Sequence, residues 1–352
     1  MIKTILFSFL FLGLSCSKLP FESTKVERTK PIVRWSQNFD PVYDSGNLPI
    51  GTNGPLIYNG LVFIGTPKKQ MKAFDLEKGN EIWSSNELHT PSARPSIYNK
   101  KWLIYGSNGG RVYSRNYLTG KIRYKIDLGS AIEATPVFYK GRGIFHLRNH
   151  KIIVLDAETG KVLWSYKRSV PFTTTLHGAS KPVVKDNRIF VGFADGFVIC
   201  LRVEDGSLLW EQKVAAKFKF IDVDMSPAIS NNFLYAGPQN GPLQVLSLDS
   251  GKVVRSLNYQ ISRGPLTSGE QKYWGTTDGS IVELGRYDKE VAKIDLKSGA
   301  ITGLNFWKDK ILVGTSSGKF FILNRDSLSI SCLLYTSPSP RDRQKSRMPS
   351  SA

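Results

Sequence analysis

One short stretch decides the fold: DAETGKVLW, at Asp156–Trp164. Its acidic residue and its glycine are typical of a tight turn, and the apolar residues that end in tryptophan are typical of a β-strand. The same pattern returns every 40 to 46 residues, at Asp75–Trp83, Tyr117–Tyr124, Val203–Trp210 and Leu248–Ser256, with weaker copies at Arg286–Ile294 and Asn324–Ile330. A period of this length indicates a repeat architecture.

Upstream of each of these turns lie two short apolar runs joined by a turn that contains glycine. One example is IFVGFADGFVICL at 189–201, where Asp195 and Gly196 favour the positive φ angles of a hairpin. Each repeat therefore holds about four strands in some 40 residues, which is the size of a β-propeller blade. No stretch keeps a helical period over three turns. The sequence predicts an all-β propeller of four-stranded blades over residues 31–331.

The number of blades follows from counting the repeats. Seven units fit between Gly51 and Ile330, and the preceding segment PIVRWS (Pro31–Ser36) resembles the last strand of a unit whose partner strands are missing. An isolated strand at the N-terminus commonly closes a propeller by pairing into its last blade. We expect eight blades, of which about seven are present, because the C-terminus looks truncated.

The N-terminus has the pattern of an export signal. Residues 1–15 carry Lys3 and then an apolar run that is too short to span a bilayer as a helix. The run ends at Gly13-Leu14-Ser15-Cys16, which resembles a bacterial lipobox, so we expect Cys16 to carry lipid. An ordinary signal peptide with a chance cysteine is the alternative. Ser17 favours the outer membrane, and residues 16–30 are expected to be a polar tether.

The other end of the chain departs from the repeat. From Cys332 to Ala352 it has no apolar period, and its segments CLLYTS and SRMPSSA resemble translated sequencing-library adapters. We expect residues 332–352 to be an adapter artefact, not native sequence. A natural basic tail is the alternative.

The basic composition is weaker evidence for a nucleic-acid partner once the two ends of the chain are set aside. The whole chain has a net charge of +19, while residues 16–331 hold 43 basic and 28 acidic side chains. These charges are dispersed over predicted turns, with no basic helix, no arginine-rich run and no aromatic RNA-binding signature. We therefore expect a solvated strand-and-turn surface and no nucleic-acid partner.

The lipobox, the Trp35 segment and the repeated TGKxxW units together resemble the BamB family of lipoproteins, which belongs to the PQQ-like propellers. The resemblance covers residues 1–331. It implies a non-enzymatic scaffold on the periplasmic face of the outer membrane, within the β-barrel assembly (BAM) complex. The implied partners are the POTRA domains of BamA, other BAM components and unfolded β-barrel substrates.

The resemblance also implies a partner-binding site in two segments. Thr174–Pro182 and Asp222–Pro227 match, in order and spacing, the segments that face BamA in the family. The residues carried over are Thr174, Leu176, His177, Asp222 and Asp224. His177 stands where the family has arginine, and a neutral imidazole lacks the bidentate contact of a guanidinium. Thr174 stands where the family has leucine.

The two acidic residues also have a meaning that is independent of the family. Asp222 and Asp224 point the same way if their segment is extended, and they then form a negative patch on a basic protein. Such a patch suits a basic partner. The alternative is a pair of solvated loop carboxylates.

A quinone-dependent enzyme of the same fold is the main rival. It requires a metal held by carboxylate and amide oxygens within the central funnel, and the sequence shows no such cluster. We expect no catalytic residue, no metal site and no cofactor. A ligand-sensing propeller, or a lipoprotein propeller of another envelope complex, also remains open.

The remaining chemically notable residues are expected to be structural. Cys200 lies in the apolar run FVICL, where a small buried side chain is expected. The other residues of this kind are three histidines in different repeats and three tryptophans expected to pack between blades: His89, His146, His150, Trp83, Trp164 and Trp210.

Overall fold

The computed structural model describes residues 32–37, 39, 54–170, 179–215, 223, 225–238 and 240–335. Within these ranges the chain forms seven antiparallel sheets, each of four strands consecutive in sequence, called blades 1 to 7 here. Blade 1 consists of β1 (Leu56–Tyr58), β2 (Leu61–Thr66), β3 (Gln70–Asp75) and β4 (Glu81–Asn86), and blade 2 of β5 (Ser96–Tyr98), β6 (Trp102–Gly106), β7 (Arg111–Asn116) and β8 (Ile122–Asp127). Blade 3 consists of β9 (Val137–Tyr139), β10 (Arg142–His146), β11 (Lys151–Asp156) and β12 (Val162–Lys167). Blade 4 consists of β13 (Val183–Lys185), β14 (Arg188–Gly192), β15 (Phe197–Arg202) and β16 (Leu208–Lys213). Blade 5 consists of β17 (Ala228–Ser230), β18 (Phe233–Ala236), β19 (Leu243–Ser247) and β20 (Val253–Leu257). Blade 6 consists of β21 (Ile261–Ser268), β22 (Gln271–Thr276), β23 (Ser280–Leu284) and β24 (Glu290–Asp295). Blade 7 consists of β25 (Ile301–Trp307), β26 (Lys310–Thr315), β27 (Lys319–Asn324) and β28 (Ile330–Tyr335).

Blade 4 illustrates why these residues form a blade. Its middle strands β14 and β15 pair with Val191 opposite Ile199, and both strands are mostly buried. The turn between them contains Gly196 at a φ of 85°, a conformation that side chains other than glycine rarely adopt. The outer strand β16 alternates exposed and half-buried residues, because only one of its faces meets a neighbouring blade.

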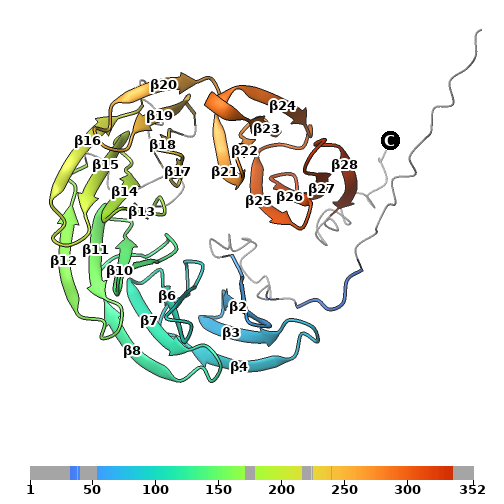
Figure 1. The fold of residues 1–352 in the computed structure, drawn as a ribbon. Coiled ribbons are helices and arrows are strands. Elements are labelled where there is room, and N and C mark those ends of the chain that lie inside the picture. Colours follow the sequence, from blue (N-terminus) through green and yellow to red (C-terminus); the bar gives the residue numbers. More distant parts are fainter. Residues whose placement is uncertain are drawn as a thin grey trace, which may run out of the picture.

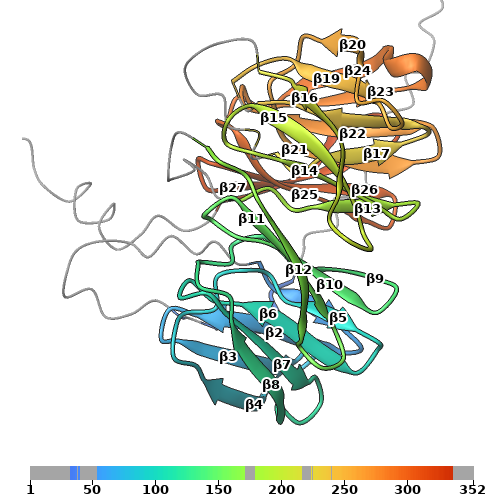
Figure 2. The same cartoon turned by 90° about the vertical axis from the view of Figure 1, so that its left-hand side faces the viewer.

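The blades lie around a central axis in chain order (Figure 1), and the side view separates blades 1–3 from blades 4–7 (Figure 2). Six hydrophobic clusters fill the six interfaces between consecutive blades. The cluster between blades 3 and 4, for example, joins Ile144 and Val154 to Val191 and Ile199. Within the described residues no cluster joins blade 7 to blade 1. The core is thus a set of apolar layers, each shared by two neighbouring blades.

An aromatic side chain from each early outer strand docks on the turn glycine of the next blade. Trp164 donates from Nε1 to the carbonyl of Val203 at 3.0 Å, and its ring covers Gly206. A Cβ added to Gly206 would lie 2.5 Å from the Trp164 ring, so only glycine allows this approach. The same arrangement joins Trp83 to Gly120, Tyr124 to Gly160, and Trp210 to Gly251. The prediction that Trp83, Trp164 and Trp210 pack between blades is confirmed.

Trp35 makes this contact from outside blade 1. Its ring covers Gly79, and its Nε1 donates to the carbonyl of Leu76 at 2.9 Å. Residues 32–37 therefore contact blade 1 in the same way that the outer strand of one blade contacts the following blade. The pairing of this segment into the last blade, which the sequence predicts, stays a prediction.

The predicted fold class is confirmed as an all-β propeller, with seven four-stranded blades in the described residues. The single helical element described is the short 3-10 turn η1 (Arg286–Asp288). An eighth blade stays a prediction. Residues 1–31, with the expected signal, Cys16 and the tether, lie outside the described residues.

The last strand runs past the boundary predicted at Ser331. β28 includes Cys332 to Tyr335 and pairs with β27 along its length. Backbone groups make this pairing, so it depends little on which side chains the segment carries. Residues 336–352 lie outside the described residues, and the artefact interpretation of the tail stays a prediction.

Candidate functional site

The five predicted partner-binding residues, Thr174, Leu176, His177, Asp222 and Asp224, lie outside the described residues. What the structure describes is the frame that holds their segments. The frame consists of the preceding residues up to Val170, the following residues 179–182, and residues 223 and 225–227. The first segment leads from β12 into β13, and the second from β16 into β17, so both enter an innermost strand of the ring.

The two segments converge on the end of β14. Ser180 donates its hydroxyl to the Gly192 carbonyl at 2.9 Å and accepts the Gly192 N–H at 3.1 Å. Val223 donates its N–H to the carbonyl of Phe193 at 3.1 Å, and its side chain covers Gly192. Ser180 and Val223, one described residue of each segment, therefore meet at Gly192.

A direct hydrogen bond links the segments. The Lys181 N–H donates to the Ser226 hydroxyl at 3.2 Å. Each of these residues precedes the proline that leads into an inner strand, Pro182 before β13 and Pro227 before β17. Proline fixes φ and restricts the residue before it to extended backbone, so both loops end in rigid steps.

His146 supports the end of the first segment through a buried hydrogen bond to Ser180. Its Nδ1 lies 2.9 Å from the Ser180 carbonyl, so this nitrogen carries the proton. Burial lowers the pKa of His146 to about 4, and the imidazole is neutral at ordinary pH. Its ring centroid lies 5.0 Å from that of Phe193, and the His150 ring centroid lies 6.4 Å from the same phenylalanine. Both histidines are buried, which agrees with the structural role predicted for them.

Arg168 fixes the point where the first segment leaves β12. Its guanidinium donates to Asp195 at 2.5 Å and to Glu211 at 2.6 Å, and it lies 4.5 Å over the ring of Phe197. Burial alone would lower the pKa of Arg168, but the two carboxylates outweigh it and the pKa is raised. Arg168 therefore stays charged and holds the start of the first segment against the β14–β15 turn and strand β16 of blade 4. The sequence does not single out this residue.

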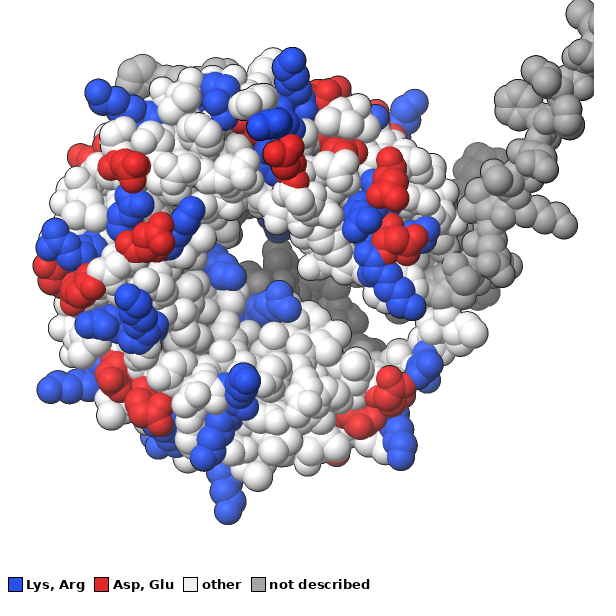
Figure 3. Space-filling view, viewed as in Figure 1, with Lys and Arg blue, Asp and Glu red and all other residues white. Residues whose placement is uncertain are grey.

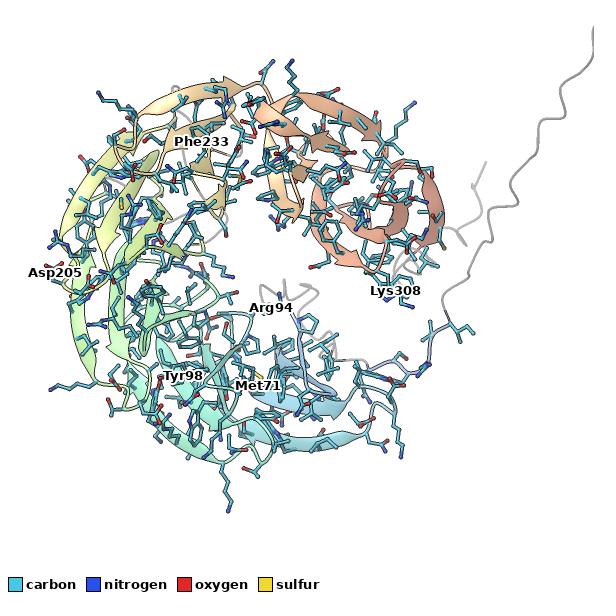
Figure 4. All side chains as sticks on the ribbon, in the orientation of Figure 1. Met71, Arg94, Tyr98, Asp205, Phe233 and Lys308 are labelled. Carbon is cyan, nitrogen blue, oxygen red and sulfur yellow. The ribbon has the colours of Figure 1, made fainter. Side chains whose placement is uncertain are left out.

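The central opening carries positive charge next to this frame. Figure 4 shows Arg94 beside the opening, directly before Pro95 and β5. Burial and the nearby charge of Arg94 lower the pKa of Lys181, which holds the equivalent place in blade 4. Figure 3 shows basic side chains at the rim of the opening, while elsewhere lysines and arginines alternate with acidic residues. The repeated residue–proline step is the sequence signal that could have identified this pair.

Cys200 is buried between blades 4 and 5, as the sequence predicts, and burial raises the pKa of its thiol to about 12. Across the described ranges no group of three or more His, Cys, Asp or Glu side chains is arranged to hold a metal ion. Among the same residues no helix has the length and apolar character needed to cross a membrane.

Comparison with known proteins places the chain in a family. The sequence model of the family described as outer membrane protein assembly factor BamB matches residues 67–302. BamB of Yersinia pestis is 26% identical over 271 residues, which span 72% of this chain and 64% of that protein. BamB of Shewanella oneidensis is 22% identical over 296 residues, which span 78% and 75% of the two chains.

Solved structures show the same fold. The crystal structure of BamB from Moraxella catarrhalis superposes with a TM-score of 0.71 at 21% identity, over 82% of this chain and 88% of that one. The computationally designed Ika8 protein superposes with a TM-score of 0.67 at 18% identity, over 80% and 86% of the chains. On the match of the family model to two-thirds of its length, this chain belongs to the BamB family of outer membrane protein assembly factors.

Proposed function

We propose that this protein is a non-enzymatic scaffold lipoprotein of the outer-membrane β-barrel assembly machinery. It is anchored through Cys16 at the periplasmic face of the outer membrane. It binds the POTRA region of BamA through the segments at 174–182 and 222–227, and it assists the insertion of β-barrel proteins. Relatives from Yersinia pestis and Shewanella oneidensis carry the name of outer membrane protein assembly factor.

One observation supports the use of these two segments as a single surface. They are separated by about 40 residues, yet the Lys181 N–H donates to the Ser226 hydroxyl at 3.2 Å. Ser180 and Val223 both dock on Gly192, so the exits of both loops are fixed to one strand end. A rigid frame of this kind lowers the entropy lost when loops bind a partner.

The test replaces both acidic residues, Asp222→Asn with Asp224→Asn, in the full chain. We expect co-purification with BamA to fall by about a hundredfold or more, because two charged contacts are lost and each loss weakens binding by about 1.5 kcal/mol or more. The matched control is Glu204→Gln with Asp205→Asn, at the turn between β15 and β16 on the other end of blade 4. Undiminished BamA recovery removes the proposed interface, and tight quinone binding favours an enzyme.

The departure at position 177 provides a gain-of-contact test. His177→Arg restores a planar, permanently charged donor, and we expect it to strengthen recovery of a BamA that carries an acidic residue opposite. The anchor is tested by Cys16→Ser, which is expected to move the protein from the membrane fraction to the soluble periplasmic fraction. Unchanged membrane association would contradict lipidation.

A further inference from the structure

Blade 2 has a charged residue where every other blade has a buried apolar one. Arg115 lies in β7 at the register shift opposite Ile122 of β8. The residues at the same register shift in the other six blades are Phe74, Leu155, Leu201, Leu246, Leu284 and Leu323, all buried. The repeat thus predicts an apolar side chain at position 115, and arginine departs from that rule.

A second departure faces the first from blade 1. Glu87 donates its N–H to the carbonyl of Lys69. The equivalent backbone bond is made by the buried apolar residues Leu128, Val214 and Leu296 and, after blade 3, by the charged Arg168. The side chain of Glu87 is 1% exposed, and it pairs with Arg115 at 2.9 Å. Its Oε1 also accepts the Tyr105 hydroxyl at 2.6 Å. A buried ion pair rarely stabilises more than the apolar residues it replaces, so stability alone does not explain the exchange.

The exchange leaves a groove of about 630 Å³ between the end of β4 and strands β7 and β8, a volume within the range of small-molecule sites. Its wall includes Asn86, Glu87, Arg111, Tyr113 and Lys125. The carboxylate of Glu87 is engaged by Ser85, Tyr105 and Arg115. The carboxylate of Glu87, the negatively charged acceptor in the groove wall, therefore already has hydrogen-bond donors from the protein.

The other polar groups of the groove have donors to offer. The Tyr113 oxygen accepts the Leu88 N–H at 3.3 Å, which leaves its own proton for a ligand. The Asn86 carbonyl oxygen accepts from Gln70 at 3.0 Å, which leaves the amide NH₂. Arg111 approaches Asp127 only to 3.7 Å, and Lys125 adds an ammonium group. A ligand that fits must supply acceptors and negative charge.

We propose that this groove between blades 1 and 2 binds carboxylate-bearing ligands, which are held by Arg111, Lys125 and Tyr113. A free dicarboxylate and an acidic segment of another protein share this chemistry. The inference does not depend on the proposed BamA contact, because the segments of that contact lead into blades 4 and 5.

The test measures binding of two probes to the full chain, glutarate by calorimetry and a fluorescent acetylated hexaglutamate peptide by anisotropy. We expect Arg111→Gln with Lys125→Gln to weaken binding at least about tenfold. Tyr113→Phe removes only the hydroxyl and is expected to weaken binding about threefold. The control is Lys151→Gln with Lys167→Gln, a cross-strand pair in blade 3 at the register of Arg111 and Asp127. It removes two charges and is expected to leave binding unchanged.

The probes also separate the two sources of carboxylate. Affinity for glutarate equal to that for the peptide assigns the site to a small dicarboxylate, and a marked preference for the peptide assigns it to a protein segment. Either result supports the proposal. Equal weakening by both double variants would show a general charge effect and overturn the proposal. The finding that neither probe binds would also overturn it.

Discussion

The docking of Trp164 on Gly206 can be tested by adding a single methyl group. Gly206→Ala places a Cβ 2.5 Å from Cε3 of Trp164, well inside van der Waals contact. It also forces alanine to a φ of +74°. The backbone term costs about 1–2 kcal/mol, and overpacking adds about 1–3 kcal/mol. We expect a total loss of about 2–5 kcal/mol in the free energy of unfolding.

Gly60 provides a matched control because it separates the two terms. It has the same φ of +74°, but nothing lies within 4 Å of an added Cβ. Gly60→Ala is therefore expected to lose only the backbone term of about 1–2 kcal/mol. The difference between the two variants measures the aromatic contact between blades 3 and 4.

Urea unfolding followed by tryptophan fluorescence and by far-UV circular dichroism is the assay. A further variant, Trp164→Leu in the Gly206→Ala background, removes the ring that the new methyl group meets. We expect the two changes to be non-additive, as for any pair of residues in contact. Equal destabilisation by Gly206→Ala and Gly60→Ala, or strict additivity with Trp164→Leu, would refute the reasoning.

Three further predictions concern buried groups. The pKa of His146 is lowered from 6.5 to about 4, so as the pH falls the unfolded chain takes up a proton at this residue before the folded protein does. We therefore expect about 3 kcal/mol of stability to be lost between pH 6.5 and 4. His146→Asn should flatten that part of a pH–stability profile. Asp288 is 1% exposed in its side chain and pairs with the buried Lys272 at 3.2 Å, so Asp288→Asn should destabilise by about 3–5 kcal/mol in urea unfolding, and a loss under 1 kcal/mol would contradict a buried pair. Burial raises the pKa of Cys200 to about 12, so a thiol reagent should modify it only at the rate of unfolding. Cys332 is partly exposed, so the modified residue is identified by peptide mass mapping, and modification of Cys200 in native protein within seconds would contradict its burial.

The repeat was readable from sequence because its signals are local. Gly160 and Gly206 mark turns a few residues from the apolar runs they join, and hairpin pairing depends mainly on such neighbours. The tryptophans at 83, 164 and 210 recur at one place in the repeat, so their role between blades was also predictable. Even Trp35, far from the strands it resembles, was identified by the pattern around it.

The frame of the site was predicted only in part. The resemblance selected the two segments, but it did not indicate that His146 supports Ser180 or that Arg168 fixes the first segment between Asp195 and Glu211. These partners come from different strands and loops, at distances of 27 to 43 residues along the chain. No local pattern links residues so far apart, and no spacing rule predicts which of them meet.

The sequence by itself determined the strands, the turns and the order of the blades, because hydrophobic period and turn chemistry act over a few residues. Only the tertiary structure decided which side chains of neighbouring blades come together. Arg115 shows the difference: in sequence it is one more charged residue in a strand, and in the ring it is the single charge at a position that six other blades fill with leucine or phenylalanine. Its meaning depends on Glu87, which the stacking of blade 1 on blade 2 brings within hydrogen-bonding distance, and on Tyr105 of the neighbouring strand β6.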